Sequence, residues 1–199
     1  MKHIEVEQKF HLQNHAELRD RLKKADAKRL RIEHQVDTYY NAPHRDFLAE
    51  PNVSEWLRLR EEKDTSSITY KRWLPLKAKV KTHCDEFESE LSDGEAMRKL
   101  LEALYFTELI VVDKRREEWQ LTDVIIALDT IKDLGSFVEF EYHGDAKTVN
   151  EAHRRIEQCI AKLDAKLGDT HTGYPHQLIA KRRPNNNSPY AKPPASLSA

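Results

Sequence analysis

Alternation of polar and apolar residues is the dominant pattern along this chain. In residues 4–10, Glu5, Glu7 and Lys9 would lie on one face of a β-strand, and the apolar residues would lie on the other face. Strand patterns return in seven further segments, which are residues 29–41, 55–60, 68–73, 86–91, 106–121, 124–129 and 137–142. The sequence therefore predicts about eight strands, mostly joined as antiparallel hairpins.

Helical spacing of apolar residues interrupts this pattern at three places. It predicts one helix over residues 15–27 with Asn14 as its N-cap, a second that is capped by Ser92 or Asp93 and runs through residue 104, and a third over residues 147–167. Residues 174–181 are predicted to dock back on the domain. Residues 182–199 are rich in Asn, Pro, Ser and Ala, which predicts a disordered tail behind a single domain over residues 1–181.

These elements predict an α+β fold, namely an eight-stranded antiparallel closed β-barrel with helices packed outside. A closed sheet has an inner and an outer face, so the charged face of each strand lies either inside the barrel or on its outer surface. If the helices cover the apolar outer face, the charged residues point into the interior.

Composition excludes several functional classes. Charged residues make up 34% of the 199-residue chain and hydrophobic residues 39%, while the net charge is −1. Such a balance gives no overall field to attract nucleic acid or an anionic membrane. Cys84 and Cys159 lack the spacing of a zinc site, and no apolar run approaches a membrane span or a signal-peptide core. We expect a cytoplasmic protein with reduced thiols that contacts neither nucleic acid nor membrane.

The charges predicted for the interior point to a ligand. The acids are Glu5, Glu7, Glu88, Glu90, Asp129, Glu139 and Glu141, and the bases are Lys9, Arg58, Arg60, Lys71 and at least one residue of the 114–116 cluster. Burying an unpaired charge costs several kcal/mol, so an interior with this many charges is expected to bind ligands that neutralise them. Paired carboxylates match Mg²⁺ or Mn²⁺, and the bases match phosphate oxygens. The pattern predicts a metal-bound polyphosphate; the alternative is a set of surface salt bridges worth about 0–1 kcal/mol each.

A series of short motifs also resembles a known family. Residues 5–9 read Glu-Val-Glu-Gln-Lys, which is similar to the ExExK signature of the CYTH superfamily, the triphosphate tunnel metalloenzymes. Further matching motifs follow in order at residues 37–40, 56–61, 69–71, 88–90, 114–116, 128–130 and 135–141. The resemblance covers about residues 1–181 and leaves out the tail.

The resemblance implies an eight-stranded tunnel that holds a triphosphate end to end, with Mg²⁺ or Mn²⁺ as cofactor. The implied metal ligands are Glu5, Glu7, Glu88, Glu90, Asp129, Glu139 and Glu141. The implied phosphate-binding residues are Lys9, Arg58, Arg60, Lys71, Arg115 and Arg116. Tyr39 and Lys71 are the implied catalytic residues, with Tyr39 assisting water activation. One departure from the family pattern is Gln177, because related members carry a lysine at this position. Lys181 or His176 would have to take the role of that lysine.

Three functions are compatible with this interpretation. The first is metal-dependent hydrolysis of the terminal phosphate of a small triphosphate, such as thiamine triphosphate, tripolyphosphate or a nucleoside triphosphate. The second is a class IV adenylate cyclase, in which the ribose 3′-hydroxyl attacks the α-phosphorus of ATP. The third is a polyphosphate-binding module without turnover. The expected partner is a small-molecule triphosphate, and a homodimer is compatible with the sequence.

Overall fold

The computed structural model describes residues 3–50, 53–76, 78, 81–170 and 173–182, and for residues 3–5 it describes the backbone alone. The strands are β1 (His3–Glu5), β2 (Glu7–His11), β3 (Lys28–Asn41), β4 (Glu55–Glu61), β5 (Ser66–Leu74), β6 (His83–Leu91), β7 (Thr107–Leu121), β8 (Val124–Ile131) and β9 (Gly135–Tyr142). The helices are α1 (His15–Lys24), α2 (Gly94–Ala103), α3 (Val149–Leu163) and α4 (Tyr174–Arg182). All strands belong to one antiparallel sheet in the order β1-β6-β5-β4-β3-β7-β8-β9-β2.

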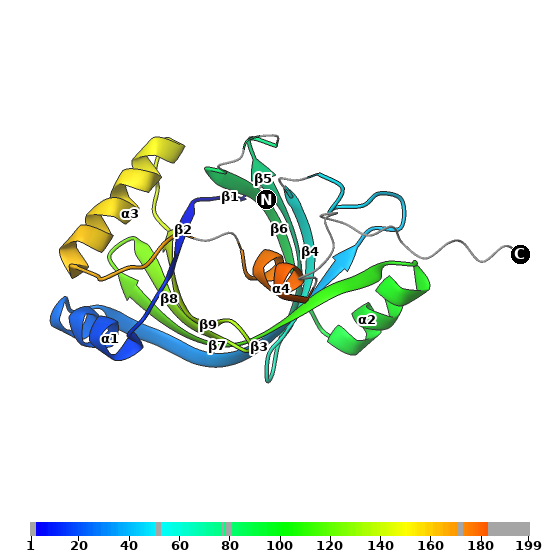
Figure 1. Ribbon diagram of the computed structural model, residues 1–199, viewed down its shortest axis with the longest axis horizontal. Coiled ribbons are helices and arrows are strands. Elements are labelled where there is room, and N and C mark those ends of the chain that lie inside the picture. Colours follow the sequence, from blue (N-terminus) through cyan, green and yellow to red (C-terminus); the bar gives the residue numbers. More distant parts are fainter. Residues whose placement is uncertain (1–2, 51–52, 77, 79–80, 171–172, 183–199) are drawn as a thin grey trace, which may run out of the picture.

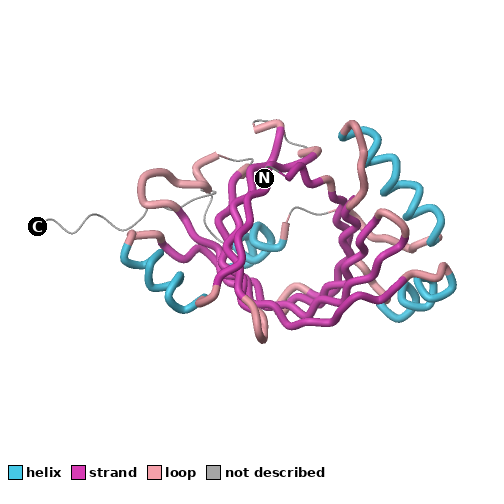
Figure 2. The backbone as a smooth tube through the Cα atoms, turned by 180° about the vertical axis from the view of Figure 1, so that it is seen from behind, coloured by secondary structure: helices cyan, strands magenta, loops and turns pink. Residues whose placement is uncertain are grey.

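The predicted eight-stranded closed barrel is wrong, because this order has two ends. The segment predicted as one strand over residues 4–10 is divided at Val6 into β1, which pairs with β6, and β2, which pairs with β9. No ladder joins β1 to β2 in the described chain. The alternation of polar and apolar residues in the sequence continues through Val6, so the sequence pattern does not reveal the break. The sheet is nine-stranded and open-edged, yet it curves around an interior space (Figure 2).

Helices α1 and α3 cover the outer face of one half of the sheet, as Figure 1 shows. Their apolar stripes pack on outward side chains of β7, β8 and β9 in one core cluster that includes Leu22, Ile126, Phe140 and Ile156, each fully buried. Burial of each such side chain contributes about 1.5–3 kcal/mol. The expectation that helices cover an apolar outer face is therefore confirmed for this half.

Side-chain caps determine where the helices begin. Asn14 accepts a hydrogen bond from the Glu17 amide at the start of α1, and Asp93 does the same for the Ala96 amide at the start of α2. Of the two predicted caps for α2, Asp93 is therefore the one used. The first and third helices are shorter than predicted, and α3 ends at Asp164, which adopts a left-handed conformation with φ 45°.

Helix α4 differs from the others because it packs at the inner side of the curved sheet (Figure 1). Tyr174 and Leu178 join a buried cluster with Ile110, Val112 and Phe137, and Ile179 contacts a second cluster at Trp56. The predicted docking of residues 174–181 is thus confirmed. The tail predicted over residues 182–199 lies, apart from Arg182 in α4, outside the described residues.

No helix in the described ranges combines the length and apolar character needed to cross a bilayer.

Candidate functional site

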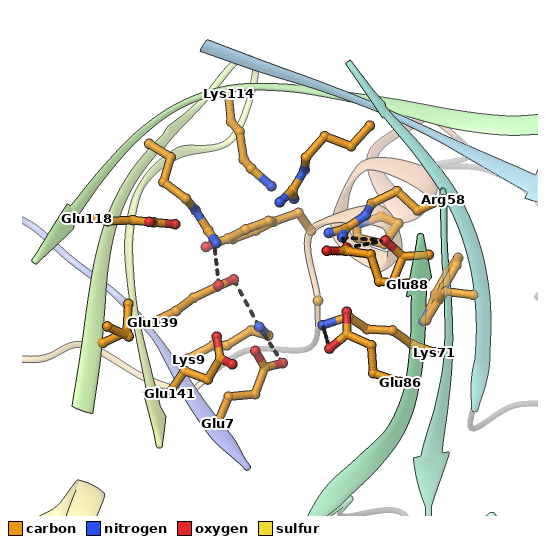
Figure 3. A pocket seen from close by; sticks show the side chains of 18 of the residues that line it. Glu7, Lys9, Arg58, Lys71, Glu86, Glu88, Lys114, Glu118, Glu139 and Glu141 are labelled. Carbon is orange, nitrogen blue, oxygen red and sulfur yellow. Dashed lines mark hydrogen bonds and ion pairs between the residues drawn. The ribbon is translucent and has the colours of Figure 1, made fainter. Parts of the chain in front are cut away.

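The concave face of the sheet forms a cavity of about 760 Å³ (Figure 3). Its charged lining comes from seven strands, which are β2, β3, β4, β5, β6, β7 and β9. The bases are Lys9, Arg31, Arg58, Arg60, Lys71, Lys114 and Arg116, and the acids are Glu7, Glu86, Glu88, Glu118, Glu139 and Glu141. The charged faces of the alternating strands therefore point inward, as the sequence predicted.

Carboxylates face one another across β2 and β9. In the antiparallel register Glu7 lies opposite Glu141, and Lys9 lies opposite Glu139. Like charges on facing positions destabilise a sheet. The Lys9 ammonium offsets this repulsion, because its Nζ lies 2.5 Å from Glu7 Oε1 and 3.0 Å from Glu139 Oε1 (Figure 3).

Both glutamates of β9 are held in the ionised form. Burial would raise the pKa of Glu139, but the charges of Arg116 and Lys9 outweigh it and keep that pKa well below its usual range. Burial likewise acts to raise the pKa of Glu141, whereas its hydrogen bond with His143 and the charge of Lys71 lower it. This side of the cavity is a set of anionic oxygens at neutral pH.

Arg116 stands at the centre of a second group of contacts. Its Nε donates to Asp129 Oδ1 at 2.8 Å, and its Nη2 lies 2.5 Å from both Asp129 Oδ2 and Glu139 Oε2. The Tyr174 hydroxyl donates to the same Asp129 Oδ2 at 2.8 Å. Asp129 is 0% exposed and does not line the cavity. Asp129 therefore holds the Arg116 guanidinium from the side that faces away from the cavity.

Asp37 organises a third group deep in the wall. Arg60 binds it bidentately through Nε and Nη2 at 2.7 and 2.8 Å, and Lys114 Nζ donates to Asp37 Oδ2 at 2.7 Å. Burial acts to raise the pKa of Asp37, but Arg60 and Lys114 hold that pKa well below its usual range. Burial and the nearby Arg60 lower the pKa of Lys114 to about 7, although Asp37 opposes the shift.

Arg58 and Lys71 complete the basic side of the cavity. Arg58 Nη2 donates to Thr69 Oγ1 at 2.8 Å and to Glu88 Oε2 at 3.2 Å, while its buried Nε has no hydrogen-bond partner among the described residues. Lys71 Nζ lies 3.5 Å from Glu86 Oε2. The Glu88 side chain is 47% exposed, so an incoming anion can compete with it for Arg58, whose Nη1 also lies 3.9 Å from the buried Asp37 Oδ2.

The structure brings most of the predicted site residues together. Those that line the cavity are Glu7, Lys9, Tyr39, Arg58, Arg60, Lys71, Glu88, Arg116, Glu139 and Glu141. Glu5 lies in β1, and its side chain is outside the described part of the structure. Glu90 is exposed near the end of β6 and does not line the cavity.

Arg115 is also absent from the cavity wall, in contrast to the phosphate-binding role implied by the motif. Neighbouring residues of a strand point to opposite faces, so Arg115 is exposed on the outer side while Lys114 and Arg116 face inward. Lys114 was missed as an individual site residue, although its spacing of two from Arg116 could have identified it.

Other residues that line the cavity were not predicted, and the sequence pattern marks only some of them. Glu86 and Glu118 lie in register with Lys71 and Arg31, and the same period of two could have found them. Tyr174 reaches the cavity only because α4 folds back against the sheet, which no local pattern reveals.

The three residues considered for the late lysine position do not supply a base to the cavity. Gln177, His176 and Lys181 all lie in α4, and none lines the cavity. His176 packs edge-on against Trp56 with 4.9 Å between ring centroids, and Lys181 donates to the backbone carbonyl of Asp133.

Comparisons with known proteins identify the family to which this chain belongs. The model of the CYTH domain matches residues 3–169, so the chain belongs to the CYTH domain family. A protein of Methanocaldococcus jannaschii named "putative adenylate cyclase" is 31% identical over 162 residues, which cover 81% of this chain and 89% of that protein.

Solved structures show the same fold. The PH1819 protein of Pyrococcus horikoshii is 28% identical, with a TM-score of 0.73 and coverage of 89% of this chain and 99% of that one. A Hippeastrum protein described as a "putative adenylyl cyclase" with a dominant triphosphatase activity has a TM-score of 0.60 and covers 92% of this chain and 96% of that one. At 15% identity this second likeness concerns the fold alone.

Proposed function

We propose that the protein is a divalent-cation-dependent enzyme that binds a triphosphate in the cavity and hydrolyses its terminal phosphoanhydride bond. One observation carries the proposal: Lys and Arg side chains from β2, β4, β5 and β7 converge on a single cavity with a facing wall of glutamates. Guanidinium groups bind phosphate oxygens bidentately, and ammonium groups act as point charges. A polyphosphate would replace the glutamates that now pair with Arg58 and Lys71.

The glutamates of β2 and β9 are the residues that would hold the cation. Glu7, Glu139 and Glu141 offer ionised oxygens, which suit Mg²⁺ or Mn²⁺. In the described residues no three acidic, histidine or cysteine side chains already stand as a metal-binding group, and Lys9 is paired with Glu7 and Glu139. A bound cation would neutralise phosphate charge and help to activate water. The phosphates would at the same time give Lys9 a new partner.

Tyr39 and Lys71 would act on the reacting group itself. Tyr39 lines the cavity, and burial together with Asp37 raises the pKa of its hydroxyl. The phenol therefore stays protonated at neutral pH and would orient a water molecule through hydrogen bonds, not as a base. Lys71 and Arg58 would stabilise charge that develops on the transferred phosphoryl group.

Adenylate cyclase activity is the second candidate, and the name of the Methanocaldococcus relative favours it. The cavity volume of about 760 Å³ falls within the range of sites that hold whole organic ligands, so a nucleoside triphosphate would fit as well as tripolyphosphate. The two reactions differ in which phosphorus atom faces the nucleophile.

Product analysis separates these functions. The protein is incubated with ATP, thiamine triphosphate or tripolyphosphate in the presence of Mg²⁺ or Mn²⁺. Release of phosphate indicates the hydrolase, and cyclic AMP with pyrophosphate indicates the cyclase. Tight binding without any product would leave a binding module and contradict an enzymatic role.

Two variants and a matched control test the assignment of the site. We expect Arg58→Ala to lower kcat/KM by roughly 100-fold, the effect of losing one preorganised charge donor. Glu7→Gln should raise the Mg²⁺ concentration needed for activity. Arg115→Ala removes an arginine from the outer side of β7 and should change kcat/KM by less than about twofold, within the effect of a surface substitution.

A further inference from the structure

Tyr174 is the first residue of α4 and forms part of the cavity wall together with Pro175, while Leu178 and Ile179 of the same helix pack on apolar residues of the sheet. It is only 4% exposed. Its ring lies 5.9 Å from Lys114 Nζ, and its hydroxyl donates to Asp129 Oδ2 at 2.8 Å. One side chain thus contacts two of the charged groups described above from a segment 45 residues further along the chain.

Asp129 faces the guanidinium of Arg116 with both oxygens. Oδ1 accepts from Arg116 Nε, while Oδ2 accepts from Arg116 Nη2 and from Tyr174. The carboxylate is fully buried and does not line the cavity, so a ligand in the cavity reaches Arg116 and not Asp129. A bidentate pair fixes the plane of a guanidinium, and a third donor on the same carboxylate restricts the carboxylate in turn.

We propose that Tyr174 is a positioning residue for the triphosphate site, acting through Asp129 to fix the orientation of the Arg116 guanidinium. Asp129 is then the middle member of this relay. The expected consequence is tighter binding of the triphosphate by a correctly oriented Arg116, and this consequence rests on the proposed function.

The protonation state of the phenol agrees with a donor role. Burial and the nearby charges of Asp129 and Glu139 raise the pKa of Tyr174 well above its usual value. The hydroxyl therefore keeps its proton throughout the neutral range and remains a hydrogen-bond donor to Asp129.

Tyr174→Phe removes the hydroxyl and keeps the ring beside Lys114. We expect the Kd for tripolyphosphate, measured by titration calorimetry with Mg²⁺, to rise by about tenfold, as expected for losing a hydrogen bond to a charged group. Tyr70→Phe is the matched control, because the Tyr70 hydroxyl donates to Glu55 and does not line the cavity. This control should leave the Kd within about twofold.

A double-mutant cycle tests whether Tyr174 acts through Arg116. Arg116→Lys keeps the charge but removes the planar fork, so there is no guanidinium left to orient. Adding Tyr174→Phe to Arg116→Lys should therefore weaken binding by less than about twofold, in place of tenfold. Full additivity of the two effects would overturn the proposal.

An NMR measurement in the absence of ligand separates this inference from the proposed function. The Nε–H signal of Arg116, identified by its absence in Arg116→Lys, should shift and exchange faster in Tyr174→Phe than in the wild type or in Tyr70→Phe. If this signal is unchanged, the positioning role is refuted whatever the Kd shows. If the signal changes but the wild type binds no triphosphate, the positioning role stands and the proposed function fails.

Discussion

Lys114 is the residue at which burial and charge are most closely balanced. It is 3% exposed and has two arginines, Arg60 and Arg116, and two aspartates, Asp37 and Asp129, as electrostatic neighbours. Its pKa of about 7 contrasts with the ordinary lysine value of 10.5. Between these two pH values the unfolded chain binds more protons than the folded chain, so the free energy of unfolding rises with pH in this window.

The first prediction concerns this window. Between pH 7 and 9 the wild type should gain about 2 kcal/mol relative to Lys114→Met, because the variant has no amine to titrate. Asp37 keeps its bidentate partner Arg60 in the variant. The measurement is urea denaturation at pH 6, 7, 8 and 9. Parallel stability curves for the two proteins would contradict the lowered pKa of Lys114.

An exposed lysine serves as the control for this experiment. Lys132 follows β8, and its side chain is 70% exposed. Lys132→Met should leave the pH dependence of unfolding equal to that of the wild type.

The sequence predicted the direction of individual side chains well, and its errors came from incomplete use of the same rule. A period of two places Glu7, Lys9 and Arg58 on the inner face, where the structure has them. The same period assigns Lys114 and Arg116 to the inside and Arg115 to the outside. What it could not predict is that Asp129 is withdrawn behind Arg116, because that depends on contacts across the sheet and with α4.

At the scale of elements, α4 connects the end of the described chain to the cavity. Leu178 is 6% exposed in a cluster with Ile110, Val112, Ile131 and Phe137, and this packing places Tyr174 in the wall. The sequence predicted that this segment docks, but its nine residues show no strong amphipathic pattern from which the docking surface could be derived. The break at Val6 was equally invisible, because alternation defines the faces of a strand and not its pairing partners.

The second prediction is that Leu178→Ala detaches α4. Removing the buried side chain should cost about 2–4 kcal/mol locally. Amides of residues 174–182 should then exchange with deuterium at least tenfold faster, while β7 and β8 keep their protection, as measured by mass spectrometry. Leu100→Ala on α2, where the side chain is 49% exposed, is the control. Faster exchange across the whole sheet would show that α4 is not an independent unit of stability.

At the scale of the whole molecule, the largest apolar cluster and the charged cavity lie on opposite faces of one sheet. The outer face holds the apolar core under α1 and α3, including the fully buried Leu22 and Ile156. The inner face holds charged groups that satisfy one another in pairs. The sequence predicted this division from alternation alone, although it predicted a hydrogen-bonded closure that the open strand order does not have.

The last prediction follows from this division. A polyanion that binds the inner face of the folded protein but does not bind the unfolded chain must raise the free energy of unfolding. The increase is about 2.7 kcal/mol when the free polyanion is present at 100 times its Kd. Tripolyphosphate with Mg²⁺ should therefore raise the Tm measured by calorimetry, and the increase should shrink as salt is raised from 0.05 to about 0.5 M because screening weakens the charge interactions.

Arg58→Ala should remove most of this increase in Tm with little effect on the Tm of the ligand-free protein. Arg115→Ala should retain the increase, since its guanidinium lies on the outer side. An equal loss in both variants would mean that the anion binds the surface of the protein, and the charges of the cavity would then need another explanation.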